Sequence, residues 1–240
     1  MINREPRTPY EKKLFSIMND IDSATKLYGF IAFVVGGFCR DEFYKTPHKE
    51  GSDVDIMAEN YRGLELAGLL ASHYHINMGY HHRTGTAQLV IGGIQFDFQA
   101  NIKFFEYLPE IRKMDLPQNN FTFNILSRDF TVNTLAMSLR SGKIYDITGK
   151  AIPDLKQGLL RTPLEPHLAI EYNPMIIVRA IRFAVKYGYS IDEELSVAMR
   201  EKVSLLSDVG EEKIAEIIGD IIKLDKKKGE AMLRDFGILQ

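Results

Sequence analysis

Apolar residues recur at helical spacing near the N-terminus and predict the first element of the chain. Ile17 and Met18 follow Leu14 by three and four residues, so all three lie on one face of a helix. The preceding residues TPYE at 8–11 have the form of a capping box with proline at the first helical position. Gly29 follows the last apolar position, so we expect the helix to end there.

Short apolar runs predict the strands. The β-branched run at 31–35 ends at a pair of glycines, which is typical of a buried strand. We expect further strands at 54–58, 87–91 and 94–98. Because only two glycines, at 92–93, separate the last two runs, they are predicted to form a β-hairpin.

Helical patterns lie mostly in the second half of the chain. In the first half a second helix, after the N-terminal one, is predicted at 61–74. Residues 115–120 have the composition of a loop. From residue 131 onward the apolar spacing indicates helices at 132–139, 174–187, 193–206 and 211–224. This distribution predicts an α+β domain followed by an all-helical one, with residues 1–140 in the first domain and 141–240 in the second.

Composition narrows the class of protein. The 240 residues carry 30 Lys and Arg against 32 Asp and Glu, a formal charge of −2, which does not favour wholesale coating of nucleic acid. A single cysteine, Cys39, excludes an internal disulfide and a cysteine zinc site. No apolar run approaches the roughly 18 residues of a membrane span, and the N-terminus is polar, so we expect a cytoplasmic protein without a membrane partner.

The first candidate site follows the predicted strand at 31–35, where the sequence reads GGFCRD at 36–41. Gly36 and Gly37 allow the backbone to approach a ligand closely, and their amides can bind an anion. Arg40, one turn later, adds a guanidinium suited to a phosphate. Taken alone, a glycine pair is more often a plain turn.

A pair of carboxylates strengthens the interpretation of the glycines as a phosphate site. Asp53 and Asp55 are alternate residues of GSDVD at 51–55, so on a strand their side chains project to the same side. Two such carboxylates repel each other unless a cation neutralises them, and Mg²⁺ prefers oxygen ligands of this kind. The alternative is a solvent-facing strand edge with two acidic residues, which the glycine segment just upstream makes less favoured.

These motifs resemble a known family. GGFCRD with GSDVDI is similar to the head of the class II nucleotidyltransferases, the tRNA CCA-adding enzymes and bacterial poly(A) polymerases of the polymerase-β superfamily. SRDFTVNTLA at 127–136 resembles the ribose- and nucleotide-binding motif of that family. DITG at 146–149 with the segment up to 161 resembles the link from head to neck, and RAIRFA at 179–184 resembles the neck helix.

The resemblance implies a polymerase-β-like head with a mixed sheet, followed by a helical neck. It also implies that Asp53 and Asp55 bind metal, with two Mg²⁺ ions expected, and that a third carboxylate, Asp97, activates the attacking hydroxyl. The nucleotide would be held by Gly36, Gly37 and Arg40 at its triphosphate, and otherwise by Arg128, Asp129, Asn133, Asn173, Arg179 and Arg182.

One motif departs from the family. The neck usually carries Glu-Asp-x-x-Arg, whose aspartate and arginine read the base edge, but the matching positions here are Tyr172, Asn173 and Ile176. An asparagine amide suits an adenine edge, whereas isoleucine donates no hydrogen bond. We therefore expect ATP to be the preferred nucleotide, with CTP second and weaker discrimination than in a CCA-adding enzyme. The family's body and tail segments do not follow the neck here, which is compatible with a smaller substrate, another RNA end or a partner subunit.

The sequence thus predicts a metal-dependent, template-independent nucleotidyltransferase that adds nucleotides from NTP to an RNA 3′ end, preferably tRNA, and releases pyrophosphate. Two alternatives remain open: transfer to a non-RNA acceptor, and a nucleotide- or RNA-binding module that has lost catalysis. The intact Asp53 and Asp55 pair disfavours the second alternative. The oligomeric state is not indicated.

Overall fold

The computed structural model describes residues 4–81, 85–99 and 108–239. The chain divides into two compact units. The first comprises residues 1–127 and 133–147, and the second comprises residues 128–132 and 148–240. We call them the head unit and the neck unit and describe each separately. In the described ranges no helix has both the length and the apolar composition that a bilayer crossing requires.

The head unit is built on a seven-stranded sheet with the order β3-β4-β5-β2-β1-β6-β7. Only β2 and β5 pair in parallel, and all other neighbours are antiparallel, so the sheet is mixed as expected. The strands are β1 (Ala32–Val35), β2 (Val54–Ala58), β3 (Gly79–His81), β4 (Thr86–Ile91), β5 (Ile94–Gln99), β6 (Ala136–Ser138) and β7 (Ile144–Tyr145). The predicted hairpin at 92–93 is confirmed as the connection between β4 and β5.

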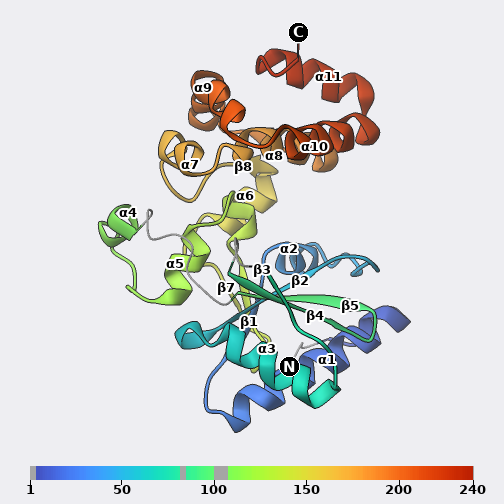
Figure 1. Cartoon of the computed structure of the whole chain (residues 1–240). Coiled ribbons are helices and arrows are strands. Elements are labelled where there is room, and N and C mark those ends of the chain that lie inside the picture. Colours follow the sequence, from blue (N-terminus) through green and yellow to red (C-terminus); the bar gives the residue numbers. More distant parts are fainter. Residues whose placement is uncertain (1–3, 82–84, 100–107, 240) are drawn as a thin grey trace. The chain divides into compact units, whose positions relative to one another are not determined.

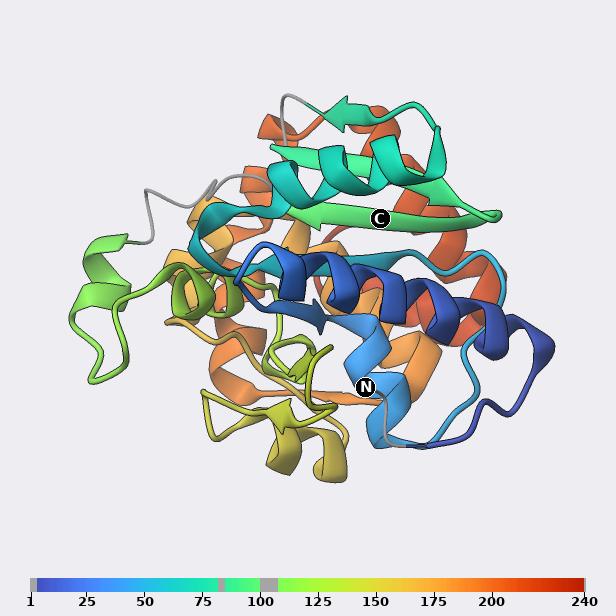
Figure 2. The ribbon, with the colours of Figure 1, turned by 90° about the horizontal axis from the view of Figure 1, so that it is seen from below.

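Helices lie on both faces of this sheet. The helices α1 (Pro9–Leu27) and α3 (Gly63–Tyr74) pack against each other and cover one face, as Figures 1 and 2 show. On the opposite face, residues of α5 (Asn120–Leu126) join a core with Phe33, Val35 and Met57. The remaining helical elements of the head unit are α2 (Gly37–Phe43), η1 (Glu59–Tyr61) and α4 (Leu108–Arg112), while η3 (Thr131–Asn133) lies where the chain passes from the neck unit back to the head unit.

The N-terminus of α1 follows the sequence pattern with one difference. Thr8 caps the helix, accepting a hydrogen bond from the backbone N–H of Glu11 at 3.0 Å, and Pro9 is the first helical residue. In a capping box the glutamate accepts from the N-cap residue itself. Here Glu11 instead accepts from the N–H of Arg7 at 2.6 Å, because its side chain is engaged in a buried ion-pair cluster.

The prediction of a helix at 132–139 is wrong. These residues form the end of η3 and the strand β6, which pairs with β1 through Phe33↔Ser138 and Val35↔Ala136. All three residues of β6 are buried. A strand covered on both faces has no polar alternation, so its short apolar run looks the same as a buried helical segment.

The neck unit is helical apart from one short pair of strands. Its helices are α6 (Ala151–Gln157), α7 (Pro166–Tyr172), α8 (Met175–Tyr187), α9 (Glu193–Lys202), η4 (Val203–Asp208), α10 (Glu211–Leu224) and α11 (Lys226–Asp235). The two-residue strands β8 (Leu159–Leu160) and β9 (Ser190–Ile191) pair in parallel. The helix α8 is central, because α7, α10 and α11 all pack against it. The boundary predicted after residue 140 remains a prediction.

Candidate active site

The parallel pairing of β2 and β5 brings two of the predicted catalytic carboxylates side by side. Asp55 on β2 is in register with Asp97 on β5. On its other side Asp55 is paired with Val35 of β1, which belongs to the core on the α5 face. Paired residues of neighbouring strands project to the same face, so both carboxylates lie on the face opposite α1 and α3. Both side chains are half-buried.

Asp97 is oriented by two glutamines of the hairpin. Gln88 Nε2 donates a hydrogen bond to Asp97 Oδ1 at 3.1 Å, and Gln95 Nε2 lies 3.3 Å from the same oxygen. Sequence reasoning missed this pair of donors. The signal was present, because a two-residue turn pairs Ile91 with Ile94 and therefore Gln88 with Asp97.

Asp53 directly precedes β2 and is exposed. Partial desolvation of its carboxyl nevertheless raises the pKa of Asp53, and the charge of Asp97 raises it further. The repulsion shows that Asp53 and Asp97 share one electrostatic environment. A cation between such carboxylates would relieve the repulsion and reverse the pKa shift.

The donor set fits a magnesium site that is completed by substrate. Carboxylate oxygens are hard ligands, and Mg²⁺ is commonly bound by one or two carboxylates together with waters and substrate phosphates. Asp53 and Asp55 supply two such groups, with Asp97 beside Asp55. A closed cage of protein ligands is not required for this mode of binding.

A different group of potential ligands lies in the head unit as well. Within the described residues, Glu11, Glu42 and His48 have ligand atoms within 4.8 Å of one another. The guanidinium of Arg4 already forms ion pairs with both glutamates. This group is therefore an ion-pair cluster built on Arg4 and not the predicted metal site.

The glycine pair forms the turn that leads from β1 into α2. Gly36 has φ +73° and ψ −134°, a conformation that residues with a Cβ rarely adopt. Arg40, one turn into α2, folds back toward the start of the helix, and its Nη2 lies 3.4 Å from the position that a Cβ on Gly37 would occupy. The structure thus places the guanidinium of Arg40 over the glycine turn, as the spacing predicts.

Arg40 is held in place by Asn133. The Arg40 side chain is only 9% exposed, and its Nη1 donates to Asn133 Oδ1 at 2.8 Å. Asn133 is itself 7% exposed and is 93 residues away in sequence. Two predicted nucleotide-binding residues from separate motifs therefore meet in the head unit.

In the neck unit, Asp129 and Arg179 form an ion pair. Arg179 Nη2 lies 2.6 Å from Asp129 Oδ2, and Asp129 Oδ1 also accepts from the backbone N–H of Phe130 at 2.8 Å. Phe130 is fully buried and packs on Phe183 of α8, with ring centroids 5.3 Å apart. The segment 128–132, part of the predicted nucleotide-binding motif, is therefore anchored to α8 by both charge and packing.

The second arginine of α8 has a different partner. Arg182 Nη1 is 4.0 Å from Asp220 Oδ2 on α10, and both side chains are about one-third to one-half exposed. Arg179 and Arg182 thus contact different acidic residues, although they lie three residues apart on one helix. Arg128 is half-buried at the start of the motif.

The two altered positions of the neck motif have different environments. Asn173 follows α7 and is half-buried, so its amide remains partly accessible. Ile176 is 2% exposed and belongs to the core of the neck. So little of the surface of Ile176 is accessible that its main contacts are internal.

Sequence reasoning also missed a buried polar network behind the motif. Asp154 Oδ2 accepts a hydrogen bond from Thr131 Oγ1 at 2.5 Å, and Arg161 Nε lies 3.2 Å from the same oxygen. The backbone N–H of Thr131 also donates to the carbonyl of Arg161 at 2.9 Å. Burial raises the pKa of Asp154, while Thr131 and Arg161 oppose that rise. The network fixes the segment that carries Asp129.

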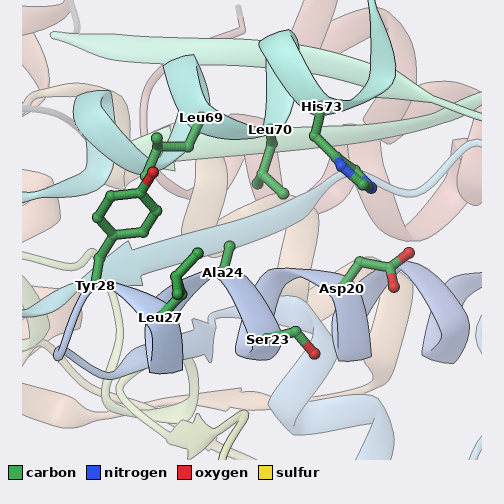
Figure 3. A pocket seen from close by; sticks show the side chains of 8 residues that line it. All are labelled: Asp20, Ser23, Ala24, Leu27, Tyr28, Leu69, Leu70 and His73. Atoms are coloured by element: carbon green, nitrogen blue, oxygen red, sulfur yellow. The ribbon is translucent and has the colours of Figure 1, made fainter.

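A cavity of about 340 Å³ lies elsewhere in the head, between α1 and α3. Figure 3 shows Leu27 of α1 and Tyr28, the next residue, facing it from one side and Leu69, Leu70 and His73 of α3 from the other. None of the predicted site residues lines it. Because α1 and α3 cover the face opposite Asp55 and Asp97, this cavity is separate from the candidate active site.

The chain is similar to known proteins over most of its length. The poly A polymerase head domain family matches residues 32–161. The CC-adding tRNA nucleotidyltransferase of Halalkalibacterium halodurans is 28% identical over 95% of this chain and 53% of its own. The A-adding tRNA nucleotidyltransferase of Aquifex aeolicus is 31% identical over 72% of this chain and 20% of its own.

The fold is shared with solved structures. The Thermotoga maritima CCA-adding enzyme complexed with tRNA matches with a TM-score of 0.76 and 24% identity, over 98% of this chain and 52% of that one. This chain therefore spans about half the length of such relatives, or less. Because the family match covers more than half of the chain and includes the glycine turn, Asp53, Asp55, Asp97 and Asn133, the protein belongs to the poly A polymerase head domain family, the class II nucleotidyltransferases.

Proposed function

We propose that this protein is a metal-dependent nucleotidyltransferase that transfers a nucleotide from an NTP to the 3′ end of a tRNA. The observation that carries the proposal is the register of Asp55 with Asp97 in the head unit, which also contains the Gly36 turn and Arg40. The names of the relatives support the acceptor, since they are tRNA nucleotidyltransferases.

The residues have distinct tasks in this proposal. Arg40, fixed by Asn133, binds the triphosphate through its guanidinium. Asp53 and Asp55 hold two Mg²⁺ ions, which when bound neutralise charge on the nucleotide phosphates. In the neck unit Arg128, Asp129, Arg179 and Arg182 bind the sugar and phosphates, and Asn173 contacts the base.

Asp97 acts as the proton acceptor. Its Oδ1 accepts from Gln88, and the carboxylate lies beside Asp55. It takes the proton of the acceptor 3′ hydroxyl, whose oxygen forms a bond to the α-phosphorus. The bond from the α-phosphorus to the bridging oxygen breaks, and pyrophosphate leaves. We expect Asp97→Asn to lower kcat more than it raises KM for NTP, because the side chain acts in the chemical step.

The choice of nucleotide is the second part of the proposal. The relatives include enzymes named for adding CC, A or CCA, so membership of the family does not fix the nucleotide. The partly accessible amide of Asn173 offers one donor and one acceptor, a pairing suited to adenine. We therefore propose ATP as the preferred nucleotide.

The test is incubation with Mg²⁺, one α-labelled NTP at a time and tRNA transcripts that end before, within or after the CC of the CCA end. The proposal predicts extension by ATP that exceeds extension by CTP, UTP or GTP and that EDTA abolishes. Failure of every NTP to extend any tRNA would contradict the proposed acceptor. Faithful addition of C, C and A in order would show that Asn173 and Ile176 do not determine base selection.

The cellular location stays a prediction. Two relatives are named mitochondrial enzymes, so the family does not by itself place this protein in the cytoplasm.

A further inference from the structure

An ion-pair cluster joins four segments of the head next to the glycine turn. Arg4 lies in the segment before α1, and its Nη1 and Nη2 donate to the two carboxylate oxygens of Glu11 at 2.8 and 2.7 Å. Its Nε lies 3.1 and 3.0 Å from the two oxygens of Glu42 on α2. His48, in the loop between α2 and β2, lies with Nε2 2.7 Å from Glu42 Oε1.

The cluster is charged and nearly closed to solvent. Glu11 is fully buried, and the side chains of Glu42 and His48 are 10% and 4% exposed. Burial alone would raise the pKa of both glutamates. Hydrogen bonds from Arg4, together with the backbone N–H groups at Glu11 and with His48 at Glu42, outweigh burial and hold each pKa at about 2.

His48 holds the loop between α2 and β2 through three contacts, two to the glutamates of the cluster and one to Phe38. The His48 ring stacks on Phe38 of α2 with centroids 3.8 Å apart and planes 8° apart. Its backbone N–H donates to Glu11 Oε1 at 3.1 Å, and its ring donates to Glu42. This loop leads directly to Asp53, so its position sets where the strand β2 and its carboxylates begin.

The same cluster also holds the helix α2, through Glu42. It has only seven residues, and it carries both Arg40 and Glu42. A helix this short has little stability of its own and depends on tertiary contacts. Arg4 supplies one such contact at Glu42 while also binding Glu11 of α1, so it ties α2 to the long helix beneath the sheet.

We propose that Arg4, Glu42 and His48 are positioning residues for nucleotide binding. They fix α2 and the following loop so that Arg40 and Asp53 face the triphosphate together. The inference rests on the proposed function, because it assigns the cluster to the binding of that substrate. None of the three residues belongs to the motifs that carry the family resemblance.

The test is a double-mutant cycle on the full chain, read as the affinity for ATP with Mg²⁺ in equilibrium dialysis. Arg4→Gln keeps much of the side-chain length but removes the charge. If Arg4 acts through α2, Arg4→Gln weakens ATP binding about tenfold in the wild type but less than about twofold in an Arg40→Ala background. Adenosine binding stays within about twofold in both, because adenosine lacks the phosphates that Arg40 contacts.

A matched control removes another ion pair in which an arginine binds both oxygens of a glutamate, elsewhere in the head. Arg62, the residue before α3, binds both oxygens of Glu65 at 2.7 and 2.6 Å, and the two side chains are 29% and 45% exposed. Arg62→Gln should leave ATP affinity unchanged. Glu42→Gln tests the cluster a second time, and it should reproduce the ATP-specific loss of Arg4→Gln.

The outcomes separate this inference from the proposed function. Absence of ATP binding by the wild-type chain would contradict the proposed function itself. Normal ATP binding that Arg4→Gln and Glu42→Gln leave unchanged would overturn the positioning role alone. Equal losses of ATP affinity with and without Arg40 would likewise overturn it, because the cluster would then contribute only general stability. Thermal unfolding of each variant confirms that the measured protein is folded.

Discussion

The buried guanidinium of Arg40 is the residue whose substitution should affect triphosphate binding most selectively. It lies over the Gly37 turn and is held by Asn133, so it is set in place before any ligand arrives. We expect Arg40→Ala to weaken ATP binding by about 1.5 to 3 kcal/mol, the value of a charge-assisted hydrogen bond, and adenosine binding by much less. Titration of both ligands measures the difference. Equal losses for ATP and adenosine would show that Arg40 is not a phosphate ligand.

Asn173 is the better of the two altered neck positions for testing base selection. Replacing Ile176 by arginine would force a charge into a position that is 2% exposed and would destabilise the neck. Asn173→Asp leaves the core intact and converts the amide into an acceptor-only group. We expect it to shift the preference toward ATP and CTP, whose bases carry exocyclic amino groups. Competition among the four NTPs measures this shift, and an unchanged ranking would contradict a role for Asn173 in reading the base.

The position of a single residue was predictable where it depends on local spacing. The sequence placed Arg40 one helical turn from the glycines, and the structure has it there. Pairings across long separations were not predicted, because a single sequence does not specify which segments meet. The contact of Arg40 with Asn133 is of this kind, as is the ion pair of Arg179 with Asp129.

The turn from β1 into α2 depends on glycine at position 36. At φ +73° and ψ −134°, an alanine would be strained by about 1 to 3 kcal/mol. We expect Gly36→Ala to destabilise the head by that amount and to raise KM for ATP, because α2 and Arg40 would shift together. Urea unfolding and initial-rate kinetics test the two effects.

Gly68 provides the control for this substitution. It lies inside α3, and a Cβ added there would meet no atom within 4 Å. Gly68→Ala should stabilise the protein by roughly 0.5 to 1 kcal/mol through helix propensity and leave KM unchanged. If both glycine variants had the same sign of effect on stability, the backbone conformation of Gly36 would not be the cause.

Helices were predictable where the apolar spacing repeats over several turns. The helices α1, α8 and α10 agree with their predicted ranges to within about a residue, since each repeats its apolar spacing over several turns. The strand β6 was mistaken for a helix because it is short and buried throughout. The two-residue strands β8 and β9 were not predicted, because two residues carry no measurable period.

The stability of the whole protein should respond to acid through the cluster at Arg4. The pKa of Glu42 is about 2 in the folded chain against a usual value of 4.5, so the folded state binds fewer protons than the unfolded state in this range. The resulting stabilisation is complete above about pH 4.5 and is lost as the pH falls toward 2. Asp53 and Asp154, whose pKa values burial raises, act in the opposite direction.

A comparison with Glu42→Gln isolates this contribution from the other groups. We expect the difference in unfolding free energy between wild type and variant to be constant from pH 7 to about 5 and to shrink steadily between pH 4.5 and 3. Urea unfolding at each pH measures it. A difference that does not change with pH would show that the carboxylate of Glu42 makes no net favourable ion pair.

The most direct measurement of the proposed activity is transfer of α-labelled ATP to tRNA by the wild-type chain and by Asp55→Asn. Asp55 lies in register with Asp97 and is a proposed metal ligand, so its loss should reduce the rate at least about a hundredfold while the fold is retained. Asp208→Asn, at an exposed position of η4, should have no effect. We predict labelled tRNA with the wild type and Asp208→Asn, and none with Asp55→Asn or in EDTA. Undiminished labelling with Asp55→Asn would contradict the assignment of the active site.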